Sequence, residues 1–246
     1  MAVPTLRSTS SAAAQTDPTF SVAKPAGAVD DDLLVAVQVS NLGGVGTPPD
    51  TPTNWELLPG RSTFSVGAFD FVCFYRVVAG DGASYTFNGP GGSPAGDTNN
   101  VWITCWEGAA AAPEEMLGNS GVGTTATALS VTTDVADEAI LCAFAIGANV
   151  GETITPDSIT DIGTIGGVAC LLDAAHTSQA SAGATGNKTA TISGIGTAWG
   201  AILIAIPPAA APEPPGGGAG GWPVHFPYVE RTAGVNILRR RVSRKL

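Results

Sequence analysis

The side chains of this sequence that could carry out acid–base or nucleophilic chemistry are few, and their spacing does not bring them together. The two histidines are His176 and His225. A hydrolytic triad needs a serine or cysteine beside a histidine that an acid orients, and no Gly-x-Ser-x-Gly turn is present. Glu114 and Glu115 are adjacent, so they do not flank one glycosidic bond as a glycosidase requires. We therefore expect a protein that is not an enzyme and that uses no cofactor.

Metal binding is the next chemistry to consider. Asp30, Asp31 and Asp32 could supply oxygen ligands to calcium, which takes several carboxylate oxygens. The other interpretation is a solvated acidic turn before a strand. The corresponding point later in the chain has only Asp137 and Glu138, which favours the turn. We expect no metal site.

Four cysteines lie inside apolar, strand-like runs. They have no Cys-x-x-Cys spacing and no neighbouring histidine, so a zinc site is not expected. We predict reduced, buried thiols that act as small hydrophobic side chains, and a disulfide is the alternative. The four residues are Cys73, Cys105, Cys142 and Cys170.

The tryptophans suggest a binding function instead. Trp55 and Trp106 lie near the ends of predicted loops, so they are candidates for exposure and for stacking on the flat faces of sugars. Trp102 and Trp199 lead two similar apolar strands, which favours places in the core. Contact of Trp55 and Trp106 with host surface glycans is therefore a hypothesis for function.

Charge divides the chain into two parts. Residues 1–221 carry 5 Lys and Arg against 20 Asp and Glu, a net charge of −15, and residues 222–246 carry 6 against 1, a net charge of +5. The acidic part argues against nucleic-acid binding over its surface. The basic part could grip phosphates or dock on an acidic protein surface, and we favour docking because copies of the acidic part would supply that partner.

The basic segment also carries apolar side chains, although it is too short to form a core of its own. We expect it to pack on another chain or on its own body, and we favour a neighbouring subunit. The residues expected to make this contact are Trp222, Phe226, Tyr228, Ile237, Leu238, Arg239, Arg240, Arg241, Arg244 and Lys245.

The body of the chain has the pattern of an all-β protein with an internal repeat. Residues 19–41 and 128–148 are alike, and each half then supplies a cysteine-centred strand and a tryptophan-led strand. Apolar residues alternate with polar ones, and turn signals recur about every 8–12 residues. The pattern predicts a jelly-roll-like, two-sheet antiparallel sandwich built from two similar halves, with an extended C-terminal tail.

The spacing of marker residues supports the repeat. Cys73 and Cys170 are 97 residues apart, and so are Trp102 and Trp199, which predicts that each pair occupies matching positions. Alternation along the predicted strands assigns a set of residues to the core. The set is Leu33, Val35, Val37, Trp102, Leu141, Ala143, Trp199 and Ile202.

Composition places the boundaries. Residues 1–17 are rich in Ser, Ala and Thr and read as an extended arm, with a first edge strand possible near Val3–Ser8. The sandwich is expected over 18–207, with halves at about 18–108 and 126–207. A Pro- and Gly-rich linker follows at 208–221, and the docking tail is 222–246. The chain start lacks the apolar run of a signal peptide, and no apolar stretch has the length of a membrane span.

Several segments, taken together, resemble a known group of proteins. They are DDDLLVAVQVSN, TPTNWELL, FYRVVAGDGASYTF, SAGATGNKTATISG and TAWGAILIAI. This combination is similar to the β-sandwich structural proteins of tailed bacteriophages of actinobacterial and similar hosts. The resemblance covers about residues 18–207. It departs from the group where TNW replaces a more common AGW and where Asp81-Gly82 replaces Glu-Pro.

The resemblance implies a virion component of the minor tail or capsid accessory type, and it supplies no catalytic residues. We therefore expect a multi-copy structural protein, assembled in the host cytoplasm, whose partners are other virion proteins. The alternative is a carbohydrate-binding adhesin module that contacts host surface glycans. No membrane partner is expected.

Overall fold

The chain is all-β: in the computed structural model every described element is a strand and every strand pairing is antiparallel. The prediction of an antiparallel β-sandwich is confirmed. The structure describes residues 1–41, 49–58, 63–66, 69–89, 98–147, 151–166, 170–194 and 197–211.

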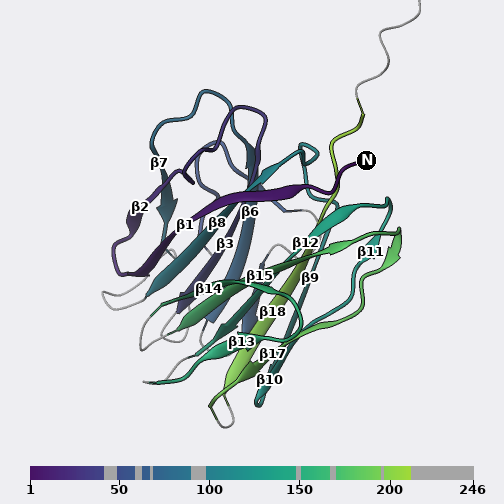
Figure 1. Cartoon of the computed structure of the whole chain (residues 1–246). Helices are drawn as coiled ribbons and strands as arrows, with labels where there is room; N and C mark the ends of the chain where they lie inside the picture. Colours follow the sequence, from purple (N-terminus) through teal and green to yellow (C-terminus); the bar gives the residue numbers. More distant parts are fainter. Residues whose placement is uncertain are drawn as a thin grey trace, which may run out of the picture. The chain divides into compact units, whose positions relative to one another are not determined.

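Two large sheets form the centre (Figure 1). The strands of sheet A are β1 (Thr5–Gln15), β3 (Leu33–Asn41), β4 (Glu56–Leu57), β5 (Thr63–Val66), β6 (Phe69–Val77) and β8 (Asn99–Glu107). Those of sheet B are β9 (Glu115–Val122), β12 (Glu138–Ile146), β14 (Thr160–Gly166), β15 (Leu171–Gln179) and β18 (Ala198–Ile206). Sheet A has the order β1-β8-β3-β6-β4, with β5 also pairing with β6, and sheet B has the order β14-β15-β12-β18-β9.

Three small sheets complete the described fold. One pairs β2 (Thr19–Ala23) with β7 (Ser84–Asn88). Another has the order β10-β17-β13, formed by β10 (Thr125–Ala128), β17 (Lys188–Ile192) and β13 (Ile154–Pro156). The third pairs β11 (Thr132–Thr133) with β16 (Gly183–Ala184).

Alternation along the strands explains how these sheets stack. In β3 and β12, residues at every second position point to one face, and Leu33, Val35 and Val37 share an apolar cluster with Leu141 and Ala143. This cluster lies between the two large sheets. Each fully buried side chain of this kind contributes about 1.5–3 kcal/mol relative to exposure.

The intervening residues of the same strands point outward, and each is covered by a small sheet. Leu34 of sheet A packs with Phe20 and Phe87 of β2 and β7. Ile140 of sheet B packs with Ala126 and its neighbours on β10, β13 and β17. The layers are therefore β2-β7, sheet A, sheet B and β10-β17-β13, which explains why β3 and β12 are apolar at nearly every position.

The internal repeat is visible in the strand order. Reading from the first edge, sheet A runs β1-β8-β3-β6, and sheet B runs β9-β18-β12-β15 from its corresponding edge. In each half the next strand outward, β4 and β5 or β14, pairs with the last of these. Each half also has its own small covering sheet.

The two halves are related by an approximate twofold rotation. Across the interface of the large sheets β1 contacts β14, and β5 contacts β9. β9 is the counterpart of β1, and β14 is the counterpart of β5. The edge strand of each half therefore contacts the same outer strand of the other half, so one contact occurs twice. That is the geometry of an isologous dimer, here formed within one chain.

The predicted core is confirmed, but the predicted register of the repeat is wrong. Val37 lies opposite Cys73 and Trp102, and its counterpart Ala143 lies opposite Ala174 and Ile202. Equal spacing therefore did not indicate equal positions, because the connecting loops of the two halves differ in length. All residues assigned to the core are nevertheless buried: Leu33, Val35, Val37, Trp102, Leu141, Ala143, Trp199 and Ile202.

The boundary expected at residue 17 also changes. The edge strand expected near Val3–Ser8 is present and longer, because β1 runs from Thr5 to Gln15 and pairs with β8 as the edge strand of sheet A, so the sandwich begins before residue 18. In the second half β9 plays the same part beside β18. The strands of the two halves thus span 5–107 and 115–206.

Candidate functional site

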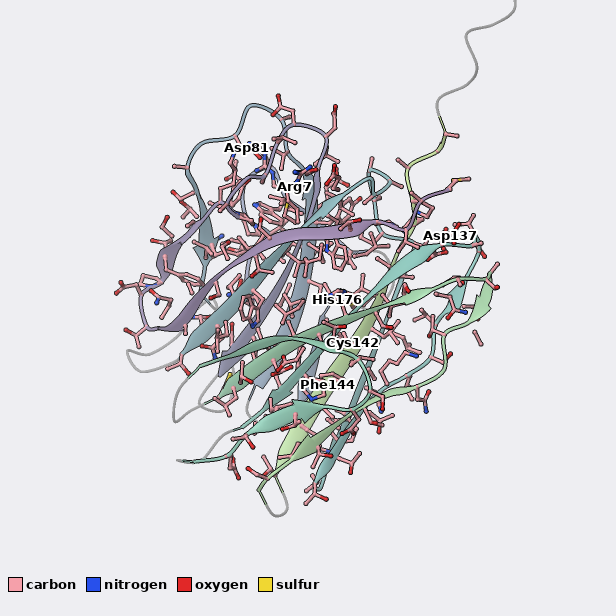
Figure 2. All side chains as sticks on the ribbon, in the orientation of Figure 1. Arg7, Asp81, Asp137, Cys142, Phe144 and His176 are labelled. Carbon is pink, nitrogen blue, oxygen red and sulfur yellow. The ribbon has the colours of Figure 1, made fainter. Side chains whose placement is uncertain are left out.

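One end of the sandwich gathers acidic side chains. Leu33 at the start of β3 lies opposite Trp106 near the end of β8, and Ala139 near the start of β12 lies opposite Ile206 at the end of β18. The α-amino group of Met1 reaches from the segment before β1 to Asp137, at 3.4 Å. We call this region the acidic end; its acids are Asp30, Asp31, Asp32, Glu107, Glu114, Asp134, Asp137 and Glu138. Figure 2 labels Arg7 and Asp137 in this part of the molecule.

In the first half the buried acid of this end is neutralised by an arginine. Asp32 ends a turn in which Asp31 has a positive φ of 73°, and its Oδ2 accepts the N–H of Val29 at 3.0 Å. The Nε of Arg7 lies 2.9 Å from the same oxygen. The Nη2 of Arg7 lies 3.2 Å from Glu107 Oε2, so one guanidinium joins a buried and an exposed carboxylate. The hydrogen bond to Asp32 is the main cause that raises the pKa of Arg7.

In the second half the same turn ends in an acid without an arginine. Asp137 has a positive φ of 64°, and Glu138 Oε1 accepts the N–H of Val135 at 3.2 Å. Glu138 is fully buried, and its Oε2 has no hydrogen-bond donor among the described residues. The neighbouring groups are the carboxylates of Glu114 and Asp134.

These surroundings favour the neutral form of Glu138. Burial is the largest cause that raises its pKa, to about 7, and the Glu114 carboxyl raises it further, against the Val135 N–H, which lowers it. Glu114 Oε2 in turn accepts the N–H of Asp134 at 3.1 Å. A cation placed beside these two carboxyl groups would favour the charged form of Glu138.

A second buried acid of the same kind lies elsewhere in sheet B. Asp173 on β15 is fully buried, and its Oδ2 accepts the hydroxyl of Thr164 at 2.5 Å. Burial is the main cause that raises the pKa of Asp173, to about 7, and Asp161 adds to it. Sequence patterns did not single out Asp173, and they assigned Glu138 only to an acidic turn, because neither the burial of a lone acid nor its neighbours across a sheet can be read from spacing.

Around Trp55 the structure forms a polar hollow of about 290 Å³. Arg76 lies over the rings of Trp55 and Tyr85, at 5.7 and 5.0 Å from their centres. It forms an ion pair with Asp81, whose other oxygen accepts the Tyr85 hydroxyl at 2.9 Å. This closed set of contacts fixes the loop after β6, and its burial raises the pKa of Tyr85.

The expected exposure of the two glycan-contact candidates is wrong. Trp55 is 5% exposed, because it packs against Tyr85 and Phe87. Trp106 is 0% exposed, because it lies in the cluster between the large sheets and its Nε1–H donates to Thr104 at 2.8 Å. Neither ring offers a face on which a sugar could stack.

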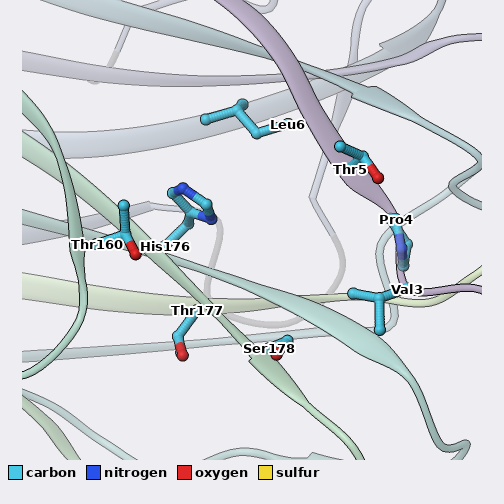
Figure 3. Close-up of a pocket in the computed structure, with 8 residues that line it drawn as sticks. All are labelled: Val3, Pro4, Thr5, Leu6, Thr160, His176, Thr177 and Ser178. Carbon is cyan, nitrogen blue, oxygen red and sulfur yellow. The ribbon is translucent and has the colours of Figure 1, made fainter.

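A second hollow, of about 370 Å³, lies where the two halves meet (Figure 3). Its walls come from the start of β1 and from β14 and β15. His176 lines it beside Thr160 and Thr177, and the ring of His176 meets the edge of Trp106 with centres 5.9 Å apart. Burial lowers the pKa of His176, which keeps the imidazole neutral near pH 7.

The predicted thiols lie where expected. All four are buried and free, and burial raises the pKa of each. One of them meets the acidic end: the Sγ of Cys105 lies 3.4 Å from Asp32 Oδ2. The four are Cys73, Cys105, Cys142 and Cys170.

The tail residues and the candidate calcium ligands complete the comparison with sequence. The docking residues from Trp222 to Lys245, and the linker from residue 212, lie outside the described residues. Asp30 Oδ1 accepts the N–H of Gly80 at 2.9 Å, so this side chain fixes the turn as Asp32 does. Within the described ranges no group of three or more acidic, histidine or cysteine side chains could hold a metal ion.

Two further observations bear on the class of protein. No helical segment in the described part of the chain has the length and hydropathy of a membrane span. Comparisons with models of protein families, with curated proteins and with solved structures found no match.

Proposed function

We propose that this protein is a structural component of a tailed-phage particle, on the capsid surface or along the tail, and that it acts through protein–protein assembly. Its partners are other virion proteins and further copies of itself, and it joins the particle in the host cytoplasm. The resemblance of residues 18–207 to β-sandwich proteins of such phages supports this proposal.

The observation that carries the proposal is the separation of charge. The described body has an acidic end in which only Arg7 and the α-amino group of Met1 form ion pairs with the acids. The C-terminal segment beyond it holds the cluster Arg239, Arg240 and Arg241. Opposite charges on two parts of one chain favour head-to-tail contact between copies, and they steer association more than they add affinity.

The apolar side chains of the tail provide the remaining free energy. Two or three buried aromatic rings, such as Trp222, Phe226 and Tyr228, contribute several kcal/mol at about 25 cal/mol per Å². Ordering the segment offsets part of this, at roughly 1–2 kcal/mol per residue of backbone. A contact with such a small net free energy forms when many copies are held close together on a particle.

Deleting residues 222–246 tests the proposal. We expect the shortened protein to remain folded and to be lost from purified particles, because the body keeps its core and loses its contact. Imaging of intact particles with labelled protein locates the full-length chain, and circular dichroism checks the fold of the shortened one. Normal incorporation of the shortened chain would contradict the proposal, as would tight, steeply salt-dependent DNA binding by the tail.

A further inference from the structure

We propose that the Glu138–Glu114 pair is the acceptor for an arginine from the basic C-terminal segment of a second copy. This rests on the proposed function, since it names the surface that the tail of a neighbouring subunit contacts. It follows from a comparison of the two halves.

The first half shows how the fold neutralises a buried acid at this place. Arg7 stands in the bulge of β1 between Leu6 and Ser8, opposite the end of β8. From there its guanidinium reaches the 4%-exposed Asp32 and the exposed Glu107. The guanidinium supplies donors to both carboxylates and remains partly exposed itself.

The second half has the same strands and the same turn, but Glu114 stands where the first half has Arg7. Glu114 stands just before β9, the counterpart of β1, and its N–H donates to Ala205 near the end of β18, at 3.0 Å. It therefore occupies the place that Arg7 takes in the first half. An acid thus faces the buried Glu138, whose Oε2 has no donor among the described residues.

The charged groups around Glu138 do not replace the missing donor. Glu114 and Asp134 are both acidic, and the α-amino group of Met1 pairs with Asp137. A guanidinium that enters beside the partly exposed Glu114 would bridge a buried and an exposed carboxylate, as Arg7 does. Arginine suits this role because its planar fork of donors matches carboxylate geometry.

The tail has the composition and the starting point for this contact. The described chain leaves the sandwich at the acidic end, where Ala209 N–H donates to Gly108 O at 2.8 Å. Beyond Ala211 lie 35 residues, and they carry Arg239, Arg240, Arg241 and Arg244. Docking on a second copy would link copies through their acidic ends.

Sedimentation velocity of the full-length protein over a concentration series tests the inference. We expect concentration-dependent association that falls about tenfold or more for Glu114→Gln. Arg240→Glu combined with Arg241→Glu, which leaves the body unchanged, should lower it equally. Asp17→Arg alters an exposed acid away from this end and serves as the matched control, with association close to that of the unaltered protein.

A charge exchange makes the test specific. The variant Glu114→Arg and the tail variant with Arg240→Glu and Arg241→Glu should each remain monomeric and should associate when mixed. Because burial raises the pKa of Glu138 to about 7 and a guanidinium pairs with its charged form, the unaltered protein should associate more tightly as pH rises from about 6 to 8. High salt should weaken the contact.

The outcomes separate this inference from the proposed function. Association that is unaffected by Glu114→Gln and by the tail reversal overturns the inference, and so does a mixture that stays monomeric. Tail-dependent association with no effect of Glu114→Gln also overturns it. If particles still require residues 222–246 in those cases, the proposed function stands and the docking surface lies elsewhere; an intramolecular contact would show as tail-dependent compaction without association, and it too overturns the inference.

Discussion

The two halves share one topology but neutralise the acid before their central strand in different ways. In the first half Asp32 and Asp81 are paired with Arg7 and Arg76. In the second half Glu138 and Asp173 are buried and form no ion pair with any residue that the structure describes, and burial raises the pKa of each to about 7. The same strand order is therefore compatible with different ion pairs. We expect the two halves to respond differently to pH.

The pH dependence of stability is the largest expected difference. The folded pKa of Glu138 and of Asp173 lies above the value in an unfolded chain, so the folded state binds more protons between about pH 4 and 7. The stabilisation is complete below the unfolded values and is lost as pH rises through 7. Together the two groups should lower the free energy of unfolding by about 5 kcal/mol between pH 4.5 and 8.

Urea denaturation at a series of pH values measures this slope. The double variant Glu138→Gln with Asp173→Asn should flatten it, because neither replacement side chain can take up or lose a proton in this range. A double variant whose stability still falls steeply toward pH 8 would show that other groups cause the slope.

Removal of Arg7 should convert the first half to the state of the second. Arg7→Leu leaves Asp32 buried without its cation and should lower the free energy of unfolding clearly, because an unpaired buried carboxylate is destabilising. Arg7→Lys keeps the charge and should lose less, and equal losses for Leu and Lys would mean that packing rather than charge stabilises this site.

Glu138→Gln alone should stabilise the protein at high pH, which is the opposite of the effect expected for Arg7→Leu. At pH 8 the neutral amide avoids the burial of a charge, and we expect a gain of about 2 kcal/mol in the free energy of unfolding. Near pH 4.5, where Glu138 is already protonated, the gain should vanish. Glu56→Gln changes an exposed acid of the first half and is the matched control; a gain that is the same at both pH values would contradict the prediction.

Thiol reactivity should differ least between the halves. Burial raises the pKa of Cys105 and of Cys142 to about 12, so a polar thiol reagent should modify one residue in each half only as slowly as the fold opens. Ellman's reagent with and without denaturant measures this. Rapid labelling of all four thiols in the native protein would contradict the burial of these cysteines.

Much of the fold could be predicted because strand burial imposes an alternation that sequence displays. Leu33, Val35 and Val37 on one half and Leu141 and Ala143 on the other follow from this period alone. Trp106 could not be placed in the same way, since a ring at the end of a strand is equally compatible with an exposed loop and with a second sheet covering it.

Only the turns of the acidic end could be predicted from the sequence. The acidic turns before β3 and β12 stand out as runs of Asp and Glu, so a turn was predicted at Asp31 and at Asp137. Their partners were not predictable, because Arg7 and Glu114 are distant in sequence and reach the turns only through the edge strands β1 and β9. The prediction that Cys73 and Cys170 occupy matching positions was wrong for a related reason, because loops of different length shift the register between the halves.

The face-to-face packing of sheets A and B has a consequence for how the chain is made. On a ribosome the strands of residues 5–107 emerge before those of 115–206, so the inner face of sheet A exists for some seconds without the layer that covers it. β1 must also wait for β8, close to a hundred residues later, before it has a neighbour. Pairings this distant in sequence form slowly, and exposed apolar faces and edges are prone to aggregate in the meantime. The nascent first half is thus a natural client for chaperones, and slower translation across residues 108–140 would prolong its exposure.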